Sequence, residues 1–196
     1  MSLIVRYALL ALALIGAGII SFKLGERARP PTPVSGSVIQ QPVQMTGLQL
    51  IDQHGNAIDL AADFAGDLTL VFFGYTRCPD VCPFTLQRLA RFKEDLGSPE
   101  GLSVVMVTVD PAHDTPEVIG AYVAAFDPSF VGLTGSNSQV AEAARAFYIG
   151  FAGSGIEQVH TDVVAVVDRQ SRLRYIYSQD AVPKLGEDLP TLLRTL

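Results

Sequence analysis

Runs of apolar residues along the chain predict the central strands of a β-sheet. Three such runs contain no charged residue and occupy residues 68–73, 102–109 and 163–167. Runs of this length, rich in Val and Leu, are typical of strands that are buried on both faces. Residues 172–177 predict a fourth strand, and residues 48–60 predict a β-hairpin whose turn contains Gly55. Most of the predicted sheet is therefore buried.

Segments between and after these strands carry helix signals. They are expected to form a helix that begins within the cysteine loop, with Pro83 near its first turn, and ends at Leu96. Further helices are expected at residues 115–126, 138–147 and 184–196. The second segment begins with Thr115 as an N-cap and Pro116 at the first helical position. Because strands alternate with helices and the chain ends in a hairpin and a helix, the order of elements predicts an α/β sandwich of the thioredoxin-like type. Ligands of such sheets gather beyond the carboxyl ends of the strands, where Cys78 and Asp110 fall.

An uncharged apolar segment covers residues 7–22 near the N-terminus. Counted from Leu3, with the side chain of Arg6 reaching toward the lipid headgroups, the segment is 20 residues long and could span a bilayer. Such a segment is either an uncleaved signal anchor or the core of a cleaved signal peptide. Because no convincing small-residue cleavage site follows it, we predict a transmembrane anchor at residues 1–29 and an extracytoplasmic body, periplasmic or equivalent.

The rest of the chain divides into a linker and one folded domain. Residues 30–46 are rich in Pro, Ser and Gln and predict an extended tether, whereas residues 47–196 can bury one sizeable core. Residues 30–196 carry ten Lys and Arg residues against nineteen Asp and Glu residues, a net charge of about −9. Such an acidic body argues against nucleic acid as a partner, because binding to phosphates needs a cationic surface.

The chain has two cysteines, Cys78 and Cys82, four positions apart at the expected start of a helix. Residues at i and i+4 share one helix face, so both sulfurs can point at a single soft ion such as Cu(I). Redox dithiols of the thioredoxin kind are usually spaced Cys-x-x-Cys. The longer spacing here favours metal capture, while disulfide chemistry and a plain structural disulfide stay open.

A third ligand would make a two-thiolate site selective. His160 is the candidate, because it directly precedes the strand predicted at residues 163–167. His54 lies in the hairpin turn and His113 in a loop after Asp110, and both are expected to be solvated. Asp110 itself is either an acceptor behind the site or a turn residue, and Arg77 would place a cation beside Cys78.

Residues 70–83 (LVFFGYTRCPDVCP) strongly resemble the signature of the SCO/SenC proteins, which handle copper for cytochrome c oxidase assembly. Further motifs extend the resemblance over residues 46–196 and lie at residues 109–111, 114–117, 126–128 and 133–136. The resemblance implies a thioredoxin-like domain behind a membrane anchor, with copper ligands at Cys78, Cys82 and His160. The chain departs from the family in having Val159, where an Asp usually precedes the ligand histidine.

The function that this resemblance implies is that of a metallochaperone. It would bind a copper ion as Cu(I), with Cu(II) also open, and deliver it to the binuclear copper centre of cytochrome c oxidase. The expected partners are the copper-bearing subunit of that oxidase, other copper chaperones or thiol reductants, and the membrane. The alternative is an enzyme, a membrane-tethered thiol-disulfide oxidoreductase that reduces the cysteines of the target before metal loading.

Overall fold

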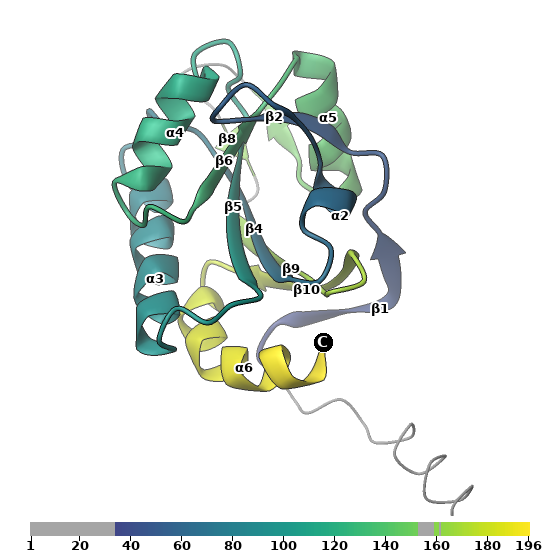
Figure 1. Ribbon diagram of the computed structural model, residues 1–196. Helices are drawn as coiled ribbons and strands as arrows, with labels where there is room; N and C mark the ends of the chain where they lie inside the picture. Colours follow the sequence, from purple (N-terminus) through teal and green to yellow (C-terminus); the bar gives the residue numbers. More distant parts are fainter. Residues whose placement is uncertain (1–33, 153–158, 161) are drawn as a thin grey trace, which may run out of the picture. The chain divides into compact units, whose positions relative to one another are not determined.

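The computed structural model describes residues 34–152, 159–160 and 162–196, and Val34–Leu196 forms one compact unit (Figure 1). Its main sheet has eight strands in the order β1-β10-β9-β4-β5-β6-β2-β3. These strands are β1 (Ser37–Gln44), β2 (Gln49–Asp52), β3 (Ala57–Asp59), β4 (Leu68–Gly74), β5 (Leu102–Thr108), β6 (Val131–Thr134), β9 (Val163–Val167) and β10 (Arg172–Ser178). β4, β5 and β6 run parallel, and the other pairings are antiparallel. A separate pair joins β7 (Phe151–Ala152) to β8 (Val159–His160).

Helices cover both faces of this sheet. They are α2 (Leu60–Asp63), α3 (Val81–Asp95), α4 (Pro116–Ala124), α5 (Asn137–Ala146) and α6 (Val182–Thr195). α3 and α4 connect successive parallel strands and lie on one side of the sheet, whereas α5 lies on the other (Figure 1). This alternation confirms the α/β fold predicted from the apolar pattern. All residues of β4 and nearly all of β5 are buried, as their uncharged runs predicted.

The helix boundaries follow local signals in the sequence. Thr115 caps α4, since its side chain accepts a hydrogen bond from the backbone N–H of Val118. Ser136 and Gln139 form a reciprocal capping box at the start of α5. These caps satisfy N–H groups that the first turn of a helix leaves without an intrahelical partner.

Part of the segment predicted as a linker belongs to the sheet. β1 lies within residues 30–46 and pairs with β10 at the sheet edge, with a register shift between Val38 and Val43. Its side chains are mostly exposed and it includes Pro42, which an edge strand tolerates next to an irregularity. A polar edge strand has no buried face to produce an apolar run, so residues 37–44 carry no strand signal.

β6 was also absent from the predicted strands. It is only four residues long and contains Gly132, which lowers strand propensity. A Cβ at Gly132 would lie 2.9 Å from Cγ1 of Ile119 on α4, so the glycine lets α4 approach the sheet closely.

Among the described residues, none of the helices combines the length and the apolar character that a membrane span requires. The anchor predicted at residues 1–29 lies outside the described residues.

A buried carboxylate fixes the turn between β9 and β10. Asp168 accepts hydrogen bonds from the backbone N–H groups of Gln170 and Arg172 and from the guanidinium groups of Arg172 and Arg174. Burial alone would raise the pKa of Asp168, but these bonds outweigh it and hold the pKa below its ordinary value. The turn is therefore stabilised only while this carboxyl group is ionised.

The variant Asp168→Asn should lower the free energy of unfolding by about 2 kcal/mol at neutral pH, because its amide would face two guanidinium groups. Urea denaturation measures this, and Asp180→Asn at an exposed site is the control. A carboxyl group with a lowered folded-state pKa loses its contribution as pH falls through that pKa. The difference between wild type and variant should thus narrow below about pH 4. An equal difference at neutral pH and at pH 3 would contradict this account.

Candidate metal centre

The two cysteines lie at the junction between β4 and α3. β4 ends at Gly74, the following loop carries Cys78, and Cys82 is in the first turn of the helix. Both are free thiols, and the backbone N–H of Cys82 donates to Sγ of Cys78 at 3.4 Å. The thiol of Cys82 is fully buried, whereas Cys78 is partly exposed. One sulfur is therefore open to a partner while the other is closed to solvent.

The buried thiol lies in a tight, apolar pocket. Burial raises the pKa of Cys82 strongly, and the neighbouring Cys78 and Asp162 act in the same direction. A Cβ at Gly74 would lie 2.9 Å from Sγ of Cys82 and 2.7 Å from the ring of Phe72. Only glycine at position 74 leaves room for this sulfur.

Two tyrosines border the thiols. Tyr75 is buried, and its pKa is raised by burial, by the nearby Cys78 and Cys82 and by a hydrogen bond to Cys78. Burial and the same two thiols also raise the pKa of Tyr122 on α4, whose ring packs edge-on against Phe126. Among the described residues, the buried Tyr122 hydroxyl has no hydrogen-bond partner. Both phenols are therefore neutral neighbours of the sulfurs.

A buried carboxylate joins the cysteine loop to the loop after β5. Asp114 accepts hydrogen bonds from the N–H (3.0 Å) and hydroxyl (2.6 Å) groups of Thr76 and from the hydroxyl group of Thr108 (2.6 Å). Its side chain is fully buried, so these donors satisfy acceptor atoms that water cannot reach. The position of the backbone two residues before Cys78 is fixed in this way.

An ion pair also connects the two loops. Nη2 of Arg77 lies 2.5 Å from Oδ2 of Asp110, whose own N–H donates to the hydroxyl oxygen of Thr108. Asp110 is thus more than a turn residue, because its carboxylate holds the side chain next to Cys78 in sequence. The cation predicted beside the thiol is engaged by Asp110.

The structure describes the side chains of two of the three histidines. His160 lies in β8, opposite Phe151 of β7, but its side chain is outside the described part of the chain. His113 and His54 are exposed in turns. Within the described side chains, no group of three or more His, Cys, Asp and Glu residues is placed to hold a metal. The set of Cys78, Cys82 and His160 remains a prediction of the sequence.

Comparison with known proteins gives consistent matches. A model of the SCO1/SenC family matches residues 39–189. A "SCO2-like protein" of Rickettsia felis is 33% identical over 153 residues, covering 76% of this chain and 74% of that protein. Apo Sco1 from Thermus thermophilus superposes with a TM-score of 0.71 at 35% identity, covering 84% of this chain and 98% of that one. ScoI of Bradyrhizobium japonicum, solved with copper bound, superposes with a TM-score of 0.66 at 28% identity, covering 78% and 98%.

The unequal burial of the thiols predicts unequal reactivity. In the reduced protein, iodoacetamide should alkylate Cys78 at least about tenfold faster than Cys82, since Cys82 is buried and its raised pKa leaves little thiolate. Mass spectrometry of peptides after timed quenching measures both rates, and unfolding in urea should bring them close together. Equal rates in the native protein would contradict the geometry.

The hydrogen bonds of Asp114 predict a local effect as well as a global one. Asp114→Asn should lower the free energy of unfolding by about 2 kcal/mol, because the amide cannot accept from all three donors. It should also speed hydrogen exchange at the backbone amide of Thr76 more than at that of Leu68, which bonds to the carbonyl oxygen of Gly101. Uniform acceleration of both amides would show that Asp114 stabilises the fold without fixing the cysteine loop in particular.

Proposed function

The chain belongs to the SCO1/SenC family, and we propose that it is a copper metallochaperone for cytochrome c oxidase. It binds Cu(I) through Cys78, Cys82 and His160 and delivers the ion to the binuclear copper centre of the oxidase. The observation that carries the proposal is a pair of free thiols four residues apart, with Cys78 partly exposed in the loop before α3 and Cys82 buried in the first turn of the helix. A relative of the same fold, solved with copper bound, supports it.

The donor atoms suit the cargo. Thiolates are soft ligands that favour Cu(I), and binding the ion requires each thiol to lose its proton. The buried Cys82 is mostly protonated before copper arrives, because burial raises its pKa. Once formed, the copper–sulfur bond in that pocket is shielded from water and from competing ligands by Phe72 and Met106.

Delivery needs an accessible copper ligand. A partner thiolate can approach the ion from the side of the partly exposed Cys78 and replace it first. Cys82, buried behind the loop, then leaves last. Stepwise exchange of this kind keeps the ion bound to at least one protein ligand throughout.

The location of the protein and the supply of its copper belong to the same proposal. An anchor at residues 1–29 would hold the domain on the extracytoplasmic side of the membrane, where thiols oxidise readily. Thiol reductants are then needed to keep Cys78 and Cys82 competent for copper. Other copper chaperones supply the ion.

A thiol-disulfide oxidoreductase is the second candidate. A partly exposed Cys78 with a buried Cys82 four residues later is an arrangement in which one thiol could attack and the other resolve a mixed disulfide. The four-residue spacing weighs against it, because redox dithiols are usually separated by two residues.

Copper binding tests the two candidates directly. The full chain, reduced and solubilised in detergent, would be titrated anaerobically with Cu(I) against a competing chelator. We expect one tightly held ion per wild-type chain and none in Cys78→Ser or Cys82→Ser. His160→Ala should weaken affinity by about 10- to 100-fold, and His113→Ala, at an exposed turn, should leave it unchanged.

Circular dichroism would show that the variants stay folded. Retained stoichiometric binding in both cysteine variants would overturn the site. No retained copper in the wild type, together with a Cys78–Cys82 disulfide that exchanges readily with glutathione, would favour the reductase.

A further inference from the structure

The outward face of α3 begins next to the thiols and is unusually rich in interface-type side chains. Phe84, two residues after Cys82, is 63% exposed. Arg88 and Arg91 follow at the i+4 and i+7 positions and so lie on the same side of the helix. We call Phe84, Arg88 and Arg91 the α3 stripe.

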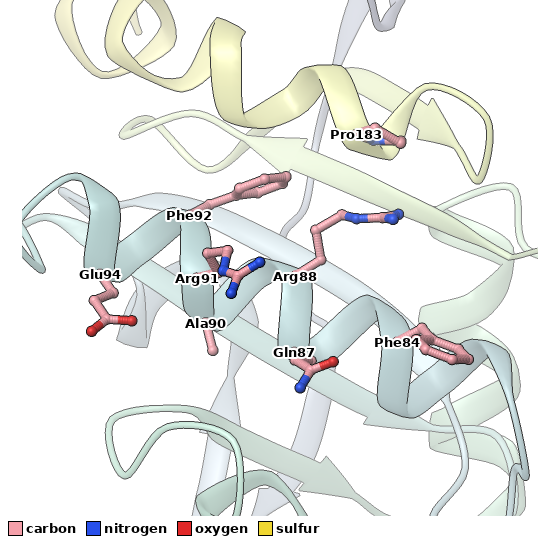
Figure 2. A pocket seen from close by; sticks show the side chains of 8 residues that line it. All are labelled: Phe84, Gln87, Arg88, Ala90, Arg91, Phe92, Glu94 and Pro183. Atoms are coloured by element: carbon pink, nitrogen blue, oxygen red, sulfur yellow. The ribbon is translucent and has the colours of Figure 1, made fainter.

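The stripe lines a groove that α6 closes on one side. Figure 2 shows Arg88 and Phe92 extending from α3 toward α6, which begins near Pro183, with Phe84 at one end of the groove. In the sequence Phe84 is two residues from Cys82, so this is the end at the N-terminus of α3. Gln87 and Ala90 line it as well, and Glu94 lies at the opposite end. The surface is therefore concave and aromatic at one end.

The two arginines carry charge that the described part of the protein does not neutralise. Neither Arg88 nor Arg91 makes an ion pair or a side-chain hydrogen bond with another described residue. By contrast, Arg77, Arg172 and Arg174 are each paired with an aspartate. On a body whose net charge is about −9 over residues 30–196, two adjacent unpaired guanidinium groups stand out.

We propose that the α3 stripe is the docking surface for an acidic protein partner that exchanges copper with Cys78 and Cys82. Aromatic and arginine side chains are enriched among the residues that carry binding energy at protein interfaces. The stripe spans about 10 Å along the helix, which fits within one standard interface patch that also reaches the thiols. The location rests on the proposed function, since only copper exchange requires a partner at this end of α3.

A protein fits the stripe better than a membrane does. Recognition of anionic lipid by charge uses clusters of about four to eight basic residues, whereas the stripe has two. The acidic body would be repelled by an anionic bilayer, and a concave groove suits a protruding side chain more than a flat headgroup layer. Acidic side chains on a partner can instead pair with Arg88 and Arg91 while an apolar pocket takes the ring of Phe84.

Charge reversal tests the proposal without relying on copper. The full chain in neutral phosphatidylcholine nanodiscs would be mixed with the oxidase domain that holds the binuclear copper centre, taken from the same organism and prepared without copper. Stopped-flow fluorescence would give the association and dissociation rates of the two proteins. Arg88→Glu/Arg91→Glu should slow association about tenfold at low salt and far less in about 1 M salt. Phe84→Ala should speed dissociation about fivefold.

The matched control is Arg145→Glu/Arg194→Glu, which reverses the same number of charges on α5 and at the end of α6. Its association rate should change less than twofold. The proposal would be overturned if the association rate fell equally in the control, or if it did not fall in the stripe variants. It would also be overturned if the association rate fell only when the nanodiscs contain phosphatidylglycerol, because the stripe would then bind lipid.

Copper affinity measured for every variant separates this proposal from the proposed function. Stripe variants that hold copper as tightly as wild type but associate slowly would support both. If the wild type held no copper, the chaperone proposal would fail, while the association rates would still decide whether the stripe binds an acidic protein.

Discussion

The geometry of the thiol site depends on the buried carboxylate of Asp114. Parallel β4 and β5 end side by side, so the loops that follow them meet at one edge of the sheet. Asp114 lies in the second loop and takes three hydrogen bonds from Thr76 and Thr108, and Arg77 reaches Asp110 in the same loop. A buried acceptor with no access to water cannot lose these donors cheaply, because no solvent would replace them. The loop that carries Cys78 is thus held in place before any ligand arrives, which reduces the ordering cost of binding.

The unequal environments of the two thiols would resolve opposing demands on the copper carrier that we propose. Tight retention favours burial, because a shielded metal–sulfur bond is protected from solvent and competing ligands. Release favours exposure, because an incoming ligand must reach the metal. Placing Cys82 behind Gly74 and Phe72 and leaving Cys78 partly exposed meets both demands with two residues of the same kind. The asymmetry comes from the helix start, where one turn separates a core position from a loop position.

The parts of the molecule that could be predicted from the sequence are those with a local signal. The apolar runs identified β4, β5 and β9, whereas of the two cysteines expected on one helix face only Cys82 lies in α3, because the helix begins at Val81 and Cys78 stays in the loop before it. β1 and β6 have no such signal, because one is polar and the other is short and contains glycine. The role of Asp114 depends on hydrogen bonds to Thr76, 38 residues away, which no local pattern records. The prediction that His160 is the third ligand rests on the family resemblance, and measurements of copper binding test it.

One helix serves three tasks because its period separates them. Leu86 and Leu89 of α3 point into the core, and Lys93 on the same side is buried with its ammonium group bonded to Ser129. The N-terminal turn holds Cys82 next to Cys78 of the preceding loop, and the α3 stripe follows the opposite side of the helix at positions that the core does not use. Since 3.6 residues complete a turn, substitutions on the stripe leave both the core face and the thiol turn unchanged. If the α3 stripe is the docking surface that we propose, partner recognition can vary in sequence without altering the fold or the proposed copper ligands.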